Sequence, residues 1–134
     1  MATATNILIV EDDRDDVYLL TRQLQQAQID DHVTWFSSGS DALTFLEQAE
    51  APPLAIFLDL NLPGLNGMEV LEKIKDDRRL RSVPVIIMTG SINPSDLKRC
   101  RQLGAKDILA KPITLSSFIK TVAHIFPAIP ESKR

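Results

Sequence analysis

The sequence predicts an α/β domain in which a parallel five-stranded sheet is doubly wound, with helices on both faces. Five apolar runs of strand length recur along the chain, and each is followed by a segment with the apolar spacing of a helix. Strands that alternate with helices form parallel sheets covered on both faces. The length of 134 residues is enough to bury one core, and the lone Cys100 excludes an internal disulfide.

The first half of the chain holds three predicted strands, which are Ile7–Val10, His32–Phe36 and Leu54–Leu58. Asp13 and Asn66 suit helix N-caps, and Ser37–Ser40 suits a turn and cap. The helices that follow present apolar stripes to the core. Their inward residues are Val17, Leu20, Leu24 and Ala27 in the first, Ala42, Leu43 and Leu46 in the second, and Val70, Leu71 and Ile74 in the third.

The second half holds the predicted strands Pro84–Met88 and Lys106–Ala110. Asn93-Pro94 opens a helix, which Gly104 ends as a left-handed cap. The last helix is predicted over Thr114–Phe126, and a frayed tail over Pro127–Arg134. The inward residues are Leu97, Cys100 and Leu103 in the fourth helix, and Leu115, Phe118, Ile119, Val122 and Phe126 in the fifth.

Connection rules reduce the possible topologies to a few. Of the topologies with right-handed crossovers, the flavodoxin-like strand order 2-1-3-4-5 is the commonest at this size, and its switch point lies between the first and third strands. Ligands bind outside the carboxyl ends of the strands at such a point. The first strand ends in Glu11-Asp12 and the third in Asp59, so the sequence predicts three carboxylates in one crevice.

The fourth and fifth strands add a hydroxyl and an ammonium to the same edge, from Thr89 and Lys111. Three ionised carboxylates repel one another strongly unless a cation neutralises them. Oxygen ligands without nearby His or Cys favour Mg²⁺, or Mn²⁺ as the alternative, over Zn²⁺. A carboxylate beside such an ion, a lysine and a threonine is suited to accept a phosphoryl group.

Four motifs stand in order at the strand ends, and they are Val10-Glu11-Asp12-Asp13, Asp59-Leu60-Asn61-Leu62-Pro63 with Gly67, Thr89-Gly90-Ser91 and Lys111-Pro112. Together they resemble the receiver domain of two-component response regulators, over about Asn6 to Phe126. The resemblance implies that Asp59 accepts phosphate from the phosphohistidine of a sensor histidine kinase. It also implies a signalling module that at most catalyses its own phosphorylation and dephosphorylation, and is otherwise no enzyme.

The same resemblance implies a role for each site residue. Asp12 and Asp59 would bind Mg²⁺ through their side chains, Asn61 through its backbone carbonyl and Glu11 through a water. Thr89 and Lys111 would contact the phosphoryl group, and the Lys111-Pro112 peptide bond would be cis.

Two positions depart from the family pattern. Many members carry an aromatic residue three positions before the lysine, where this chain has Ile108. An activation signal is therefore expected to run through the loop after Thr89 and the face formed by the fourth helix, fifth strand and fifth helix. Many members also have Asp where this chain has Glu11, a difference that an intervening water would accommodate.

Charge and segment composition give further expectations. A net charge of −3 gives no general attraction for nucleic acid or membrane. No apolar run approaches the roughly 20 residues that span a bilayer, and Met1–Asn6 lacks the features of a signal peptide. The protein is therefore expected to be cytoplasmic.

The predicted domain organisation is a receiver at residues 1–126, a flexible tail at residues 127–134, and no output domain. The expected output is a protein contact that changes on phosphorylation, or transfer within a phosphorelay, by a monomer or a phosphorylation-dependent homodimer. A looser resemblance, to single-domain regulators of phytochrome-type kinases, rests on the Asp-Leu-Asn-Leu-Pro run and the Lys75–Pro84 connection. The downstream protein target is not identified by the sequence.

Two other functions are compatible with the predicted fold. A phosphatase of the haloacid dehalogenase type would use Asp59 as nucleophile, but it needs an acid two residues on, where Asn61 stands. A flavodoxin-like cofactor binder would need hydrogen-bond donors after the first strand, where Glu11-Asp12-Asp13 would repel a phosphate.

The remaining polar and aromatic residues are interpreted as structural. The two histidines are expected at the surface, Cys100 in packing and Trp35 in packing or helix contact. The acidic residues after Asp12 are expected to be cap and first-turn charges, and they are Asp13, Asp15 and Asp16.

Overall fold

The structure is a computed structural model that describes residues 7–29, 32–91 and 93–125. The predicted tail, Pro127–Arg134, lies outside the described residues, as does Phe126 at the end of the last predicted helix. None of the helices in the described ranges combines the length and the apolar character needed to cross a bilayer.

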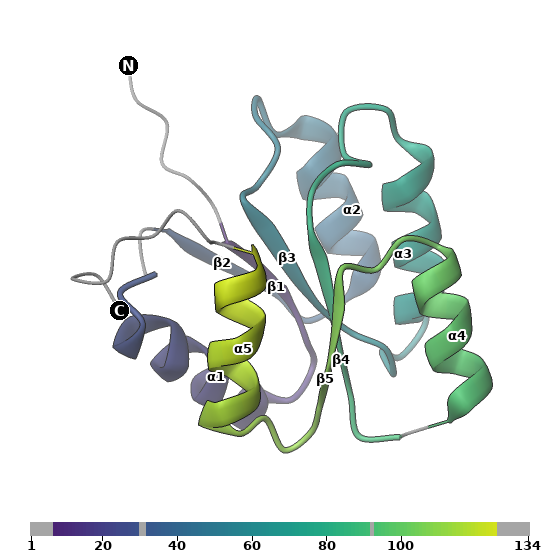
Figure 1. The fold of residues 1–134 in the computed structure, drawn as a ribbon. Coiled ribbons are helices and arrows are strands. Elements are labelled where there is room, and N and C mark those ends of the chain that lie inside the picture. The colour runs from purple at the N-terminus through teal and green to yellow at the C-terminus, as the bar shows by residue number, and fades with distance from the viewer. Residues whose placement is uncertain (1–6, 30–31, 92, 126–134) are drawn as a thin grey trace.

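Five parallel strands form one sheet in the order β2-β1-β3-β4-β5, which confirms the predicted topology (Figure 1). In this order β1 lies between β2 and β3, so the ends of β1 and β3 are neighbours. The strands are β1 Ile7–Val10, β2 Val33–Phe36, β3 Ala55–Asp59, β4 Val85–Thr89 and β5 Asp107–Ala110.

Five helices connect and follow the strands, and several begin at predicted caps. The side chain of Asp13 accepts hydrogen bonds from the first turn of α1, and Asn93 does the same for α4. Asn66 and Glu69 form a capping box at the start of α3. The helices are α1 Arg14–Gln26, α2 Gly39–Gln48, α3 Gly67–Asp76, α4 Pro94–Gln102 and α5 Leu115–Ile125.

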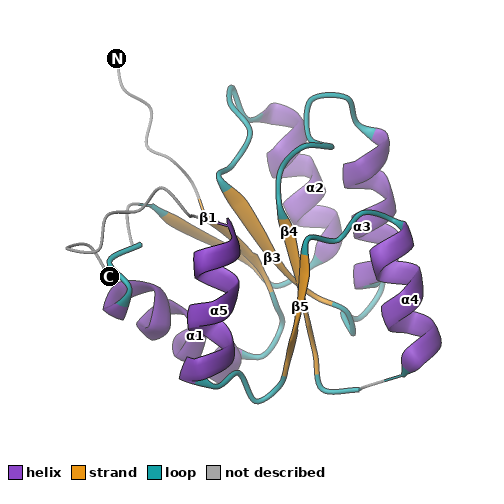
Figure 2. Ribbon diagram, viewed as in Figure 1, coloured by secondary structure: helices purple, strands orange, loops and turns teal. Residues whose placement is uncertain are grey.

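The sheet separates two hydrophobic cores. Helices α1 and α5 cover one face, and α2, α3 and α4 cover the other (Figure 2). Alternate strand residues point to opposite faces, so Phe57 packs with α1 and α5 while Leu58 packs with the other three helices. Every residue of β1, β3 and β4 is buried, because both faces of the central strands are covered.

Two strands extend one residue beyond the predicted ends, and this correction bears on the site. The predicted strands Leu54–Leu58 and Pro84–Met88 end one residue too early, because Asp59 and Thr89 are the last residues of β3 and β4. Asp59 pairs with Met88, and the carbonyl of Thr89 accepts a 2.8 Å hydrogen bond from the Lys111 amide. Both polar side chains therefore project from the ordered end of the sheet, not from a loop.

Candidate functional site

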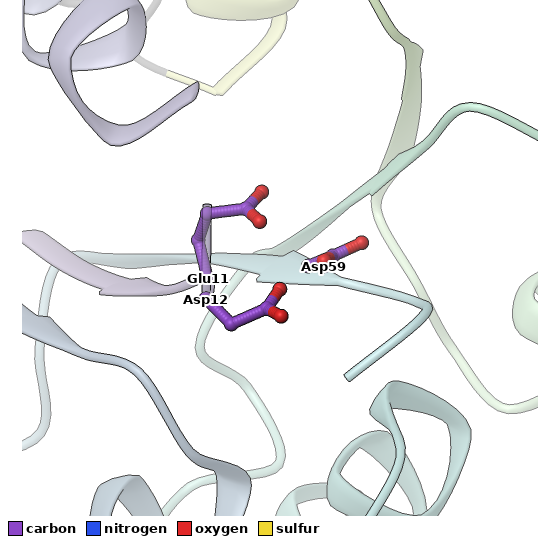
Figure 3. Close-up of side chains that lie close together, drawn as sticks. All are labelled: Glu11, Asp12 and Asp59. Carbon is purple, nitrogen blue, oxygen red and sulfur yellow. The ribbon is translucent and has the colours of Figure 1, made fainter. Parts of the chain in front are cut away.

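Three carboxylates meet at the carboxyl edge of the sheet. Glu11 and Asp12 follow β1, Asp59 ends β3, and one oxygen from each lies within 4.8 Å of the other two. Figure 3 shows Glu11 and Asp12 extending from the end of β1 toward the end of β3, where Asp59 stands. Glu11 and Asp59 are buried and Asp12 is exposed, so the cluster is open to solvent on the side of Asp12.

Asp59 is held by the loop that follows it. Its Oδ1 accepts a 3.1 Å hydrogen bond from the Asn61 amide. The chain then returns to α3 through Gly67, whose amide donates to the Leu60 carbonyl at 3.1 Å. A Cβ at Gly67 would lie only 2.2 Å from the carbonyl oxygen of Asp59, so this close approach of two backbones requires glycine.

Lys111 brings an ammonium into the cluster from the end of β5. Its Nζ lies 2.7 Å from Oε1 of Glu11, 3.0 Å from Oδ2 of Asp16 and 3.5 Å from Oδ1 of Asp59. The Lys111-Pro112 peptide bond is cis, as the resemblance implied. One cation is thus shared among three carboxylates.

This arrangement shifts two pKa values upward. Burial raises the pKa of Glu11 to about 7, although the nearby ammonium of Lys111 opposes this shift. Burial lowers the pKa of Lys111, but the contacts with Glu11, Asp16 and Asp59 outweigh it, so the net shift is upward. Lys111 therefore stays charged, whereas Glu11 titrates near neutral pH in the absence of a further cation.

Thr89 lies buried at the end of β4, and its hydroxyl already has partners. Oγ1 donates to the Ser91 carbonyl and accepts from the Ser91 amide, both at 3.0 Å. The side-chain amide of Asn61 lies 3.5 Å from the same oxygen, at the limit of a hydrogen bond. Thr89 is therefore linked to the loop that carries Asn61, two residues after Asp59.

The chemistry of the donor set fits a hard divalent cation. The cluster offers carboxylate oxygens alone, as Mg²⁺ and Mn²⁺ prefer. Oε1 of Glu11 is buried and makes an ion pair with Lys111 without a well-aligned hydrogen bond, so it can accept a further partner. Beside the cluster, a hollow of about 460 Å³ includes Asp12, Asn61 and Asp96 in its lining.

The structure thus brings Glu11, Asp12, Asp59 and Lys111 together, and places Asn61 and Thr89 at the same edge. Two further contacts escaped the sequence analysis. Asp16 was interpreted as a first-turn charge alone, yet it also pairs with Lys111. Trp35 is expected in packing or helix contact, yet its indole Nε1 donates a 2.6 Å hydrogen bond to the backbone carbonyl of Glu11.

The sequence carries only a partial signal for these contacts. Asp16 lies in the first turn of α1, which starts at the same edge of the sheet, so its proximity was accessible in principle. The contact of Trp35 depends on the register in which β2 pairs with β1, opposite Ile9, and no pattern in the sequence specifies that register.

A search of protein families matches residues 7–123 to the response regulator receiver domain. Among curated proteins, the chain is 36% identical over 124 residues to response regulator Rcp1 of Synechocystis, covering 89% of this chain and 84% of Rcp1. It is 33% identical over 123 residues to the probable methanogenesis regulatory protein FilR2 of Methanothrix harundinacea, covering 89% of this chain and 79% of FilR2.

Solved structures give the same result. The bacteriophytochrome response regulator RtBRR superposes with a TM-score of 0.83 at 32% identity, over 92% of this chain and 79% of RtBRR. The Mn²⁺-bound form of Rcp1 superposes with a TM-score of 0.77 at 34% identity, over 90% of this chain and 91% of the Rcp1 chain. The receiver domain of the Pseudomonas aeruginosa sensor histidine kinase PA1611 holds magnesium in its active site cleft. It superposes with a TM-score of 0.76 at 27% identity, over 90% of this chain and 96% of the PA1611 receiver chain.

Proposed function

Because this chain belongs to the response regulator receiver domain family of two-component systems, we propose that Asp59 accepts a phosphoryl group from a sensor histidine kinase. One observation carries the proposal. The buried carboxylate of Asp59 stands on the last residue of β3, 3.5 Å from the Lys111 ammonium and within the acidic cluster. This is the arrangement that transfer to a carboxylate requires.

In the proposed step, a carboxylate oxygen of Asp59 attacks the phosphorus of phosphohistidine. The new P–O bond forms while the P–N bond to the imidazole breaks, and the imidazole leaves with the bonding electron pair. The products are an acyl phosphate on Asp59 and a free histidine on the kinase. Lys111 neutralises charge on the phosphoryl oxygens, and the Thr89 hydroxyl donates a hydrogen bond to one of them after leaving the Ser91 carbonyl.

The proposed metal site consists of the side chains of Asp12 and Asp59, the backbone carbonyl of Asn61 and, through a water, Glu11. A bound Mg²⁺ or Mn²⁺ would offset the negative charge of the acceptor carboxylate and the incoming phosphate. The metal-bound structures of Rcp1 and of the PA1611 receiver support a divalent metal ion in this family of domains.

The residues at the site disfavour two other functions, a phosphatase and a flavin binder. Asn61 cannot protonate a leaving group, so turnover of phosphomonoesters by a haloacid dehalogenase mechanism is not expected. The acidic residues after β1 disfavour a flavin phosphate at that position. We propose a phosphoacceptor that catalyses at most its own phosphorylation and dephosphorylation.

For the partners, we propose a phytochrome-type histidine kinase upstream, supported by the similarity to RtBRR. The proposed output is a phosphorylation-dependent protein contact or onward transfer in a phosphorelay. Ile108 packs partly buried against the core under α2, α3 and α4, and as an aliphatic residue it offers no ring to turn inward. The loop after Thr89 and the surface of α4, β5 and α5 are therefore the proposed route of the signal.

The test is phosphorylation by a small donor such as acetyl phosphate with Mg²⁺, followed by intact-mass analysis. We expect one acid-stable, base-labile phosphoryl group on the wild-type protein and none on Asp59→Asn. Asp15→Asn is the matched control, because it makes the same charge change at an exposed residue outside the cluster. Equal labelling of Asp59→Asn would refute the site assignment.

A further inference from the structure

Two groups on β2 hold the backbone of Glu11. The Glu11 amide donates to the Phe36 carbonyl at 3.0 Å, which continues the β1–β2 ladder past the end of β1. The Glu11 carbonyl accepts the 2.6 Å hydrogen bond from the indole Nε1 of Trp35. A side chain on the neighbouring strand therefore supplies a partner for the first carbonyl beyond β1.

That carbonyl belongs to the peptide that joins Glu11 to Asp12, two of the three clustered carboxylates. Its direction fixes the ψ angle of Glu11 and, through the planar peptide, restricts how Asp12 leaves the strand. Asp12 is exposed, and no side-chain hydrogen bond within the described residues orients its carboxylate. The orientation of Asp12 thus depends on its backbone.

Packing alone does not explain a tryptophan at this position. Trp35 is 37% exposed and belongs to neither hydrophobic core. The indole N–H, the one polar group of its side chain, donates to the Glu11 carbonyl, and a phenylalanine at this position would supply a ring without that donor.

We propose that Trp35 is a positioning residue for the metal site, which holds the Glu11–Asp12 peptide in the orientation that lets both carboxylates converge on Asp59. The inference rests on the proposed function, because it concerns the same metal site. When a residue that orients a metal ligand without binding the metal itself is mutated, metal affinity commonly falls by about 10- to 100-fold.

The experiment uses the fact that Trp35 is the only tryptophan in the sequence. Expression in a tryptophan auxotroph with β-(3-benzothienyl)alanine replaces this residue alone, keeping the shape of the indole ring while replacing N–H by sulfur. Mg²⁺ affinity is measured by calorimetry on this protein, on Trp35→Phe and on wild type. We expect affinity about tenfold weaker for both altered proteins, with the wild-type extent of phosphorylation restored at saturating Mg²⁺.

Tyr18→Phe is the matched control, because it removes a polar group from an exposed aromatic residue on α1 and should leave Mg²⁺ affinity unchanged. A second measurement needs no variant. The single indole ¹H–¹⁵N resonance of the wild-type protein should shift as Mg²⁺ is added. The dissociation constant fitted to this shift should equal the one measured by calorimetry.

The outcomes separate the two proposals. The role of Trp35 is overturned if the benzothienyl protein binds Mg²⁺ with wild-type affinity and the indole resonance of the wild-type protein does not shift at saturating Mg²⁺. That result leaves the phosphoacceptor site unaffected. A wild-type protein that binds no Mg²⁺, and whose Asp59 is not phosphorylated, overturns the metal site itself.

Discussion

The ammonium of Lys111 lies 2.7 Å from Oε1 of Glu11 but 3.5 Å from Oδ1 of Asp59, the proposed phosphoacceptor. The lysine thus pairs most closely with Glu11, at the end of the neighbouring strand β1. From this position it offsets the repulsion among the clustered carboxylates and is near enough to Asp59 to contact a phosphoryl group there. The balance of charge around Lys111 leads to the first two predictions.

The stability of the metal-free protein should fall as pH rises from about 4.5 to about 7. Burial raises the pKa of Glu11 from 4.5 to about 7, so the native state binds a proton more tightly than the unfolded chain in this range. The expected loss is up to about 3 kcal/mol in the free energy of unfolding. Urea unfolding in EDTA at a series of pH values measures it.

Glu11→Gln is the control for the pH dependence, because the amide does not titrate. The difference in stability between wild type and this variant should change across the pH range in the absence of metal, and change less with Mg²⁺ present. Curves that stay parallel in EDTA would contradict the prediction.

Asp16→Asn should destabilise the metal-free protein by about 0.5–1 kcal/mol, because it removes a partly exposed ion pair with Lys111. Asp15→Asn loses the same charge in the same first turn of α1, so the interaction with the helix dipole cancels in the comparison. Urea unfolding should place Asp15→Asn closer to wild type. The opposite order would show that the pair contributes nothing measurable.

Thr89→Ala should slow phosphorylation of Asp59 by a small donor about tenfold, since a hydrogen bond to a charged group contributes about 1.5 kcal/mol. Thr89→Ser keeps the hydroxyl and should retain most of the rate. Mg²⁺ affinity should not change in either variant, because Thr89 lies outside the carboxylate cluster. Single-turnover phosphorylation with calorimetry separates these effects, and an unchanged rate in Thr89→Ala would exclude the proposed contact.

Two glycines after β3 should respond differently to alanine, Gly64 in the loop and Gly67 at the start of α3. At Gly67 a Cβ would meet the Asp59 carbonyl oxygen at 2.2 Å and the Leu60 Cα at 2.6 Å, so Gly67→Ala should cost about 3 kcal/mol. At Gly64 the φ angle is +71° and the space is open, so Gly64→Ala should cost about 1 kcal/mol through backbone strain alone. Urea midpoints measure both, and a larger loss at Gly64 would contradict the prediction.

The alternation of apolar runs and helical stripes was sufficient to predict the strand order, because connection rules leave few topologies for five βα units. Local signals also predicted the caps Asp13, Asn66 and Asn93, since capping depends on residues a few positions apart. The left-handed conformation of Gly104, with φ of +102°, follows from the same kind of local signal.

The sequence by itself determined that acidic residues lie at the ends of the first and third strands, and that a threonine and a lysine lie at the ends of the fourth and fifth. Only the tertiary structure decided which of these groups touch. The pairing of Lys111 with Glu11 and Asp16, and the hydrogen bond from Trp35 to Glu11, join residues distant in the chain. Such contacts depend on strand register and on the placement of helices over the sheet, which follow from packing of the whole core and not from any local pattern.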